Sequence, residues 1–441
     1  MAIKPLLSML TTSNTDYNYG YPTPAQSPNP GEVTCWLLDT RGLWPGDNIL
    51  MADGAAEALS LISVPEQNII KGKMFVQDAR MSLASALLKR LFISQTLGMK
   101  WRDVRMSRKG NAKHGKPCAV DGVGRPIAGI DFNVSHQGGL VALIGYNGRK
   151  NHEYTPSGMV YGMISPTPQD EDVMVGVDIV CVNERDDYRT IDAEGYDGWV
   201  DIYEYVFSGE ERWSMKYDVD YITLNDGSIL PSHEIGRHDR CIERNKHICL
   251  KTPEGRDHSF TSDVILDSKL RRFYTYFCYK ESYIKLAGEA LLAPWLKQLE
   301  FFNVRSPKPG QPARCSKHGT WGEEVDDVEV HMHGRNVNDV KMKIQAFEEN
   351  FMLSTAIQGE IQGIKVPAFK SLNLESDVLA FTPIRQSLTV KSNHNRIVSE
   401  PAPRMRTGEA MITSPLVHAK DVPSMNENPY MHAREVPLCL M

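Results

Sequence analysis

The feature that most constrains this chain is a helix-forming run at residues 270–292, in which a carboxylate falls inside the apolar stripe. At about 100° per residue, one face of such a helix collects the apolar side chains Leu270, Phe273, Tyr274, Phe277 and Ile284. Glu281 lies within this stripe, and Lys280 and Lys285 flank it on opposite sides. A carboxylate that faces a core is costly unless a cation or hydrogen bonds meet it. The pattern favours a site for negative charge over the alternative, a solvated Lys/Glu ladder, which belongs opposite the apolar face.

A second carboxylate interrupts the almost wholly apolar segment at residues 174–180, which predicts a short strand. Asp178 is unfavourable inside such a strand. Either the strand ends there and leaves the carboxylate in water, or the carboxylate has a function. Two carboxylates, one from a strand and one from a helix, suit Mg²⁺, which prefers oxygen ligands and keeps waters. Mn²⁺ is the alternative metal, and nearby lysines would neutralise the phosphate oxygens that such a metal usually bridges.

Composition narrows the classes to which the chain can belong. Its 441 residues suffice for two or three ordinary domains or one two-lobed enzyme, and its net charge of −6 argues against a general nucleic-acid binder. No segment approaches the ~18 apolar residues of a membrane span, and the first residues lack a signal-peptide core. The cysteines form no CxxC pair and are typical of reduced cytosolic thiols. We therefore expect a cytoplasmic protein without nucleic-acid or membrane partners, and we expect a monomer.

Composition divides the chain into a mobile segment at 1–32, two halves with a polar insertion at about 209–268 in the second, and a disordered tail at 386–441. We expect strands at 33–39 and 140–144, a helix that begins at Asp78 and runs to 98, and a hairpin at 339–358. Residues 148–172 would form the linker between the halves, and residues 303–338 a polar loop region.

Five short motifs follow one another between residues 115 and 285. They are GKP at 115–117, FNVSH at 132–136, GVDI at 176–179, FS at 207–208 and FCYKESYIK at 277–285. Each motif is weak alone, but all five in this order are specific. On these motifs the chain resembles the Sfp-type 4′-phosphopantetheinyl transferases, in particular the fungal members. The sequence has neither a Walker loop nor a dinucleotide-binding fingerprint, so side chains would hold the phosphates.

The resemblance implies an enzyme that moves the phosphopantetheine arm of coenzyme A to a serine of an apo carrier protein and releases 3′,5′-ADP. It implies an α+β fold with two similar lobes, at residues 33–165 and 166–385, related by a pseudo-twofold axis. Coenzyme A would lie in the cleft between them, with Mg²⁺ on its pyrophosphate. Acceptors would be acyl, aryl or peptidyl carrier domains of fatty-acid, polyketide or nonribosomal-peptide synthases, or of the aminoadipate reductase of lysine biosynthesis. Such a displacement at phosphorus depends on positioning and charge stabilisation.

The resemblance also assigns roles to residues of the strand at 174–180 and of the helix at 270–292. Asp178 and Glu281 would bind the metal and act in catalysis, and Glu281 would activate the acceptor serine directly or through water. Lys285 would act in catalysis, and Lys280 would contact the cofactor's phosphates.

Further contacts to coenzyme A fall to residues of the first lobe. The resemblance gives them to Lys116, Ser135 and His136, and to a basic residue on the helix after Asp78. Arg80 is our candidate for that residue, with Arg90 as the alternative. As structural alternatives, Lys116 would be an exposed loop lysine and His136 a strand-capping histidine.

The sequence departs from the family pattern at three places. Val180 stands where many bacterial relatives have a further carboxylate, Phe277 replaces the tryptophan of the last motif, and the insertion is long. A water or another group must then complete the metal shell. The alternative function is a noncatalytic regulator that binds coenzyme A or carrier domains, and a second rival is a hydrolase of nucleotide pyrophosphates. We treat the histidines and cysteines at 233–249 as loop residues, since their spacing matches no common zinc module.

Overall fold

The computed structural model describes residues 28–109, 115–149, 173–182, 187–289, 293–310, 319–360 and 362–382. They all lie in the first of the two compact units into which the chain divides, Met1–Lys391 and Ser392–Met441. Most of the expected N-terminal segment and linker, and the whole expected tail, fall outside the described residues. In the described part, no helix combines the length and the apolar character needed to cross a membrane.

The first sheet has four strands in the order β17-β1-β5-β4, with bounds Lys370–Leu372, Glu32–Asp39, Leu140–Asn147 and Ile130–Gln137. Its strands are antiparallel except β17, which runs parallel to β1. The expected strands at 33–39 and 140–144 are confirmed. The short strand β17, in a range that we expected to belong to the second lobe, instead forms one edge of this first sheet.

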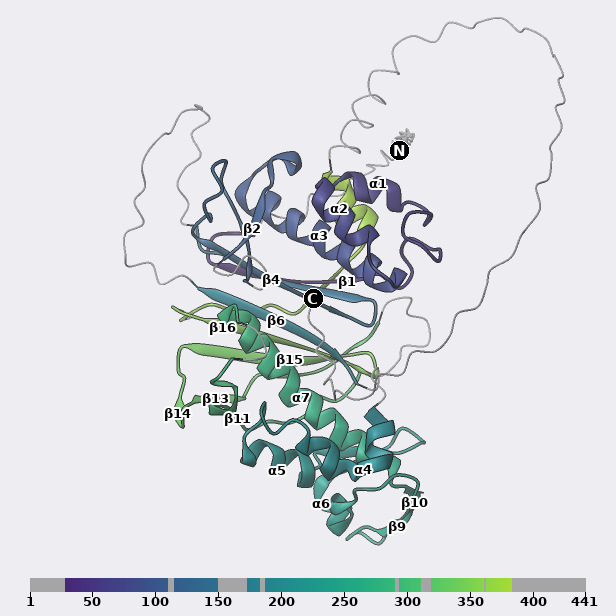
Figure 1. The fold of residues 1–441 in the computed structure, drawn as a ribbon. Coiled ribbons are helices and arrows are strands. Elements are labelled where there is room, and N and C mark those ends of the chain that lie inside the picture. Colours follow the sequence, from purple (N-terminus) through teal and green to yellow (C-terminus); the bar gives the residue numbers. More distant parts are fainter. Residues whose placement is uncertain are drawn as a thin grey trace, which may run out of the picture. The chain divides into compact units, whose positions relative to one another are not determined.

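Three helices cover one face of the first sheet (Figure 1), namely α1 (Ala55–Ser60), α2 (Val64–Lys71) and α3 (Val76–Leu97). The expected helix is α3, but it begins before Asp78, because Phe75 is its N-cap. Asp78 sits in the first turn, where its charge complements the helix dipole. Gly98 adopts a left-handed conformation with φ of 62° and ends the helix. Trp36 and Leu38 of β1 pack against these helices, whereas Cys35 and Leu37 face the other way.

The second sheet has the order β12-β15-β16-β6, with bounds Trp321–Val325, Val340–Phe347, Phe351–Gln358 and Met174–Cys181. The hairpin expected at 339–358 is confirmed as β15–β16. The prediction of a loop region at 303–338 is wrong in part, because β12 pairs with β15 across a register shift. A separate small sheet also forms there from β11, β13 and β14, at Leu299–Phe302, Glu329–Met332 and Arg335–Asn336. Short strands with such mixed polarity give no clear period-2 signal.

The long helix α7 (Asp263–Ala287) covers the outer face of the second sheet (Figure 1) and contains most of the run predicted at 270–292, including every residue of its apolar stripe. It begins earlier than expected because Val264, Ile265 and Leu266 pack against neighbouring apolar side chains. It ends before residue 292 because Gly288 turns left-handed at the C-cap, with φ of 73°.

The two sheets bury a shared apolar layer between them, and β6 brings Val175, Val177 and Ile179 into it from the second sheet. A hairpin of β2 and β3, at Met106–Arg108 and Pro117–Ala119, leads into β4. The fold is thus a mixed α/β arrangement of two four-stranded sheets, each with helices on its outer face.

The expected insertion is not a plain loop. It contains α5, β7, β8, α6, β9 and β10, at Gly209–Tyr217, Tyr221–Thr223, Ile229–Pro231, Ser232–Ile235, His247–Lys251 and Asp257–Thr261. Helix α4 (Asp187–Asp201), which kinks at Gly195, precedes it. The insertion has an apolar cluster of its own, in which Ile222, Leu230 and Ile235 are almost fully buried. The chain then returns into α7.

Candidate functional site

Asp178 is the centre of the candidate site. Strand β6 continues through it to Cys181, and only 4% of Asp178 is exposed, so the alternative of a strand that ends in water at this residue is wrong. Its neighbours Val177 and Ile179 face the layer between the sheets, which turns Asp178 toward α7. The Asp178 Oδ1 accepts a hydrogen bond of 2.9 Å from the Ser135 hydroxyl of β4 and one of 2.5 Å from the Lys285 ammonium of α7.

Glu281 and Lys285 lie one turn apart on α7 and therefore share a face of the helix. The Lys285 Nζ also donates to the Ser135 Oγ at 2.8 Å. Burial lowers the pKa of Lys285, but the charges of Asp178 and Glu281 outweigh it and raise that pKa above its usual value. The structure thus brings together four predicted residues, Ser135, Asp178, Glu281 and Lys285, from three elements.

The donor set suits a hard divalent cation. Among the described residues, both side-chain hydrogen bonds of Asp178 are made to Oδ1, which leaves Oδ2 available as a ligand. Val180 is buried in the apolar core below α7, and the described part of the chain holds no group of three or more His, Cys, Asp or Glu residues that would enclose a metal. The two carboxylates of Asp178 and Glu281 would therefore hold Mg²⁺ with most of its shell filled by water and substrate oxygens, as this ion prefers.

His136 follows Ser135 on β4 and so points to the opposite face of the sheet, toward the side covered by α3. Burial, together with the charges of Lys285, Lys73 and Lys89, lowers the pKa of His136 to about 4. The imidazole is therefore neutral at pH 7. The sequence analysis did not single out Lys73 and Lys89 as neighbours of His136. Lys89 directly precedes the alternative candidate Arg90, and the helix sequence alone does not distinguish Lys89 from Arg90.

Lys116 is neither an exposed loop lysine nor open to a ligand. Only 7% of it is exposed, and its Nζ forms an ion pair with Asp131 of β4 and donates to the Val175 carbonyl of β6 at 2.6 Å. Burial lowers its pKa, an effect that the Asp131 charge offsets in part. The structure therefore gives Lys116 a place between the two sheets, and a direct contact with coenzyme A, as predicted, is not supported by these contacts.

Of the two arginines considered on α3, the structure favours Arg80. Arg90 is 7% exposed and is occupied by an ion pair with Glu66 and a hydrogen bond of 3.0 Å to the Val104 carbonyl. Arg80 is partly exposed and donates to the carbonyls of Trp44 and Gly46 at 3.1 and 2.6 Å. It retains donors that could reach a ligand, because those bonds involve only its Nε and one Nη atom.

Lys280 lies apart from the site, and this corrects the phosphate contact predicted for it. Its side chain is 1% exposed, and its Nζ meets the Glu211 carboxylate at 2.9 Å and the carbonyls of Leu296 and Leu299 at 2.8 and 2.5 Å. All three ammonium donors are thereby used. Glu211 itself completes a capping box with Ser208 at the start of α5, so the FS motif serves the same structural junction.

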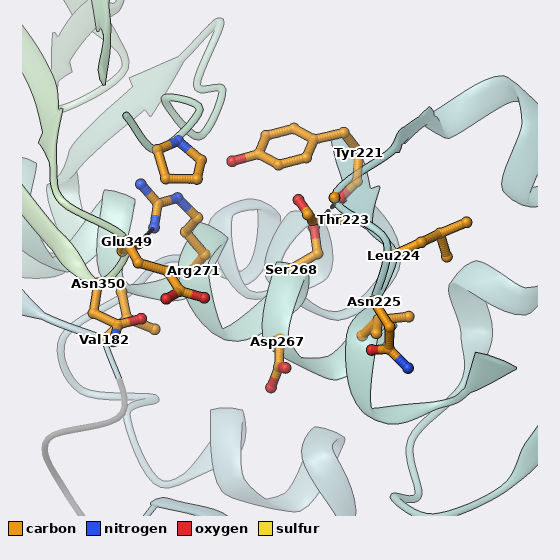
Figure 2. A pocket seen from close by; sticks show the side chains of 13 residues that line it. Val182, Tyr221, Thr223, Leu224, Asn225, Asp267, Ser268, Arg271, Glu349 and Asn350 are labelled. Atoms are coloured by element: carbon orange, nitrogen blue, oxygen red, sulfur yellow. Dashed lines mark hydrogen bonds between the residues drawn. The ribbon is translucent and has the colours of Figure 1, made fainter. Parts of the chain in front are cut away.

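A hollow of about 480 Å³ lies elsewhere in the second half, between the β7–β8 hairpin and α7 (Figure 2). Arg271 lines it, but this guanidinium donates to the Pro307 and Glu349 carbonyls at 2.9 and 2.8 Å. The carboxylates of Asp267 and Glu349 also line it and disfavour phosphate. None of the predicted site residues lines this hollow.

Comparison with known proteins identifies the family of the chain. The family model described as 4′-phosphopantetheinyl transferase, N-terminal, matches residues 52–148, which run from before α1 to the end of β5. A 4′-phosphopantetheinyl transferase of Aureobasidium melanogenum is 60% identical over 351 residues, covering 79% of this chain and 97% of that protein. 4′-Phosphopantetheinyl transferase A of Aspergillus fumigatus is 33% identical over 348 residues, covering 76% and 85%.

A shorter match reaches a relative with a named substrate. The L-aminoadipate-semialdehyde dehydrogenase-phosphopantetheinyl transferase of Schizosaccharomyces pombe is 34% identical over 109 residues, which cover 25% of this chain and 39% of that protein. The two long fungal matches decide the class. This chain belongs to the 4′-phosphopantetheinyl transferase family, whose members transfer phosphopantetheine to carrier proteins.

Proposed function

We propose that the chain is an Sfp-type 4′-phosphopantetheinyl transferase that moves the arm of coenzyme A onto a serine of apo carrier domains in a Mg²⁺-dependent reaction. The observation that carries this proposal is the junction of Asp178, Ser135 and Lys285, with Glu281 one turn before Lys285 on α7. A buried carboxylate with one free oxygen, beside a second carboxylate and a lysine, is the arrangement that a pyrophosphate and its metal require.

The residues divide the work of the reaction. Glu281 would take the proton of the acceptor serine, directly or through water, while the Lys285 ammonium would stabilise charge on the transferring phosphoryl group. When bound, Mg²⁺ would supply further charge neutralisation through Asp178 and Glu281. Lys73, Lys89 and the neutral His136 form a second polar region near α3, which supports binding of the remaining phosphate of coenzyme A.

We propose that the two sheets with their helices form two lobes related by a pseudo-twofold axis, with coenzyme A held between them. We assign residues 33–165 to the first lobe and 166–385 to the second, except that β17 joins the first sheet. The match to the Schizosaccharomyces pombe relative supports the aminoadipate reductase of lysine biosynthesis as one acceptor. Carrier domains of fatty-acid, polyketide and nonribosomal-peptide synthases are further candidates, and we propose a cytoplasmic monomer.

Intact-mass spectrometry of an apo carrier domain tests this function. After incubation with the protein, coenzyme A and Mg²⁺, the carrier should gain about 340 Da, and EDTA should abolish the gain. Carriers that stay unchanged while coenzyme A still binds would instead support the noncatalytic regulator. Release of phosphate-containing products from coenzyme A alone would indicate the hydrolase.

Glu281→Gln should remove transfer and leave the fold intact, because the change deletes a charge without changing volume. We expect a fall in kcat on the order of 100-fold or more, with an unchanged unfolding midpoint. Glu57→Gln, at an exposed glutamate of α1, is the control and should retain full turnover. Near-normal turnover of Glu281→Gln would refute the role given to Glu281.

A further inference from the structure

Among the residues that the structure describes, no strand pairs with the edge of β6 that faces away from β16, and side chains pair with this edge instead. Its partner β16 pairs along one edge through the whole of β6, from Met174 to Cys181. On the other edge, the Val175 N–H donates to the Asp131 Oδ2 at 2.9 Å, and the Val177 N–H donates to the Asn133 Oδ1 at 3.1 Å. The Val175 carbonyl accepts from the Lys116 Nζ at 2.6 Å.

The acceptors come from alternate positions of a single strand. Asp131, Asn133 and Ser135 all point to the same face of β4, whereas Phe132 and Val134 pack into the apolar core under α3. Val175 and Val177 are fully buried, so their N–H groups have no access to water, and leaving them unpaired would be costly. The polar face of β4 therefore provides hydrogen-bond partners for a buried strand edge with which no described strand pairs.

The same row of side chains ends at the candidate catalytic carboxylate. Asp131 and Asn133 hold Val175 and Val177, and Ser135, the next residue on that face, donates to Asp178. The position of β6 along β4 therefore determines where the Asp178 carboxylate lies relative to Ser135 and Lys285.

We infer that Asp131 and Asn133 are positioning residues of the transferase: their side-chain oxygens fix the free edge of β6 and so place Asp178 for metal and pyrophosphate. This inference rests on the proposed function. Neither residue needs to touch substrate, because both act through the backbone of Val175 and Val177. Groups that orient metal ligands in this way typically cost 10–100-fold in activity or metal affinity when they are removed.

The test compares two buried asparagines. Asn133→Leu removes the acceptor at similar volume, and Asn133→Asp retains an oxygen that can accept from the Val177 N–H. Asn147→Leu is the matched control, because Asn147 is 4% exposed and Asn133 is 5% exposed. The Asn147 side chain donates to the Pro28 carbonyl at 2.7 Å and makes no bond to β6 that the structure shows among the described residues. For each variant, we would measure hydrogen exchange of the Val177 amide, the unfolding midpoint, kcat, and the Mg²⁺ concentration that gives half-maximal activity.

We expect Asn133→Leu to speed exchange of the Val177 amide, to lower kcat by about 10–100-fold and to raise the Mg²⁺ requirement. Asn133→Asp should recover most of the loss, and Asn147→Leu should lower the unfolding midpoint while kcat stays within about twofold. Should Asn133→Leu fail to fold, Asn133→Ala, which only removes atoms, gives the same comparison.

Three results would overturn the inference: normal kcat and Mg²⁺ dependence in the folded acceptor-deleted variant, a Val177 amide that stays protected in it, or an equal loss of kcat in Asn147→Leu. Failure of the proposed function has a different signature. The wild-type protein would then transfer nothing to any carrier, whereas the amide exchange would still report whether Asn133 holds β6.

Discussion

At the scale of single residues, two lysines of the FCYKESYIK motif differ in their burial and in their bonding partners. Lys280 and Lys285 lie five positions apart on α7 and therefore face different sides of the helix. Lys280 turns toward α5, where Glu211 and two carbonyls use every donor. Lys285 turns toward β6 and β4, where its ammonium meets Asp178 and Ser135. Lys280 therefore serves the fold and Lys285 the candidate site.

The two lysines should respond in opposite ways to replacement by methionine. Lys280→Met leaves Glu211 buried without its cation, which should lower the free energy of unfolding by about 3–5 kcal/mol. The molecules that remain folded should turn over normally. Lys285→Met should lower kcat on the order of 100-fold. Denaturant unfolding and steady-state kinetics on both variants check this prediction, and a kcat loss in folded Lys280→Met would contradict it.

His136 should make stability depend on pH. Its pKa of about 4 in the folded protein lies below the ordinary value near 6.5, so the unfolded chain binds the proton first as the pH falls. The contribution of His136 is therefore fully present above about pH 6.5 and is lost progressively toward pH 4, to a total of about 3 kcal/mol. His136→Gln should flatten the stability profile in that window, as measured by denaturant unfolding at several pH values. Identical slopes for the two proteins would refute the lowered pKa.

At the scale of elements, the site depends on how closely α7 approaches β6. Gly176 makes this possible: a Cβ added there would lie 2.1 Å from the Ser282 carbonyl oxygen and 2.6 Å from the Leu286 nitrogen, both on the α7 backbone. The backbone of a helix cannot move aside as a side chain does. The glycine of the GVDI motif is therefore required by packing and sets the spacing between Asp178 and the helix that carries Glu281 and Lys285.

Gly176→Ala should displace α7 from β6. We expect a loss of at least about 1–3 kcal/mol in the free energy of unfolding, as overpacking produces. We also expect a fall in kcat, because Glu281 and Lys285 move with the helix. Gly122→Ala is the control, since an added Cβ meets nothing within 4 Å there. Normal stability and turnover of Gly176→Ala would show that the helix and sheet can separate without cost.

Elements with a strong local period were predictable, and their long-range partners were not. The apolar stripe predicted α7, and the apolar run predicted β6, because both signals lie within a few turns or residues. Ser135 and Asp178 are 43 residues apart, and Asp178 and Lys285 are 107 apart, so no period joins them; the family motifs did. Neither periodicity nor the motifs predicted the ion pairs Lys116–Asp131 and Lys280–Glu211, because Asp131 and Glu211 do not belong to the five motifs.

At the scale of the whole molecule, the first sheet is completed by a late segment of the chain. Strand β17 pairs with β1, and the helical turns that follow it, Leu374–Val378 and Leu379–Phe381, carry apolar side chains into the core under α1–α3. Leu372 of β17 and three side chains of these turns, Leu374, Val378 and Leu379, are at most 9% exposed. The first half of the fold therefore includes residues from beyond the second sheet.

Two truncations should behave differently for this reason. A chain that ends at Lys391 keeps β17 and the turns after it, and its unfolding midpoint and turnover should match those of the full chain. A chain that ends at Lys365 loses the four buried side chains, each worth about 1.5–3 kcal/mol, and should unfold or lose several kcal/mol. Thermal unfolding and the carrier-mass assay distinguish them. Loss of activity in the longer truncation would show that residues after 391 contribute to the active protein.

The position of β17 also has a consequence for synthesis on the ribosome. Strand β1 is made early, but one of its two neighbours in the sheet is made more than 300 residues later, at Lys370–Leu372. Domains commonly fold from the N-terminus as they emerge, but here the first sheet cannot be finished until nearly all of the described chain has left the ribosome. Until then, the edge of β1 that later pairs with β17 stays exposed in the nascent first half. An exposed strand edge of this kind is where a chaperone would bind.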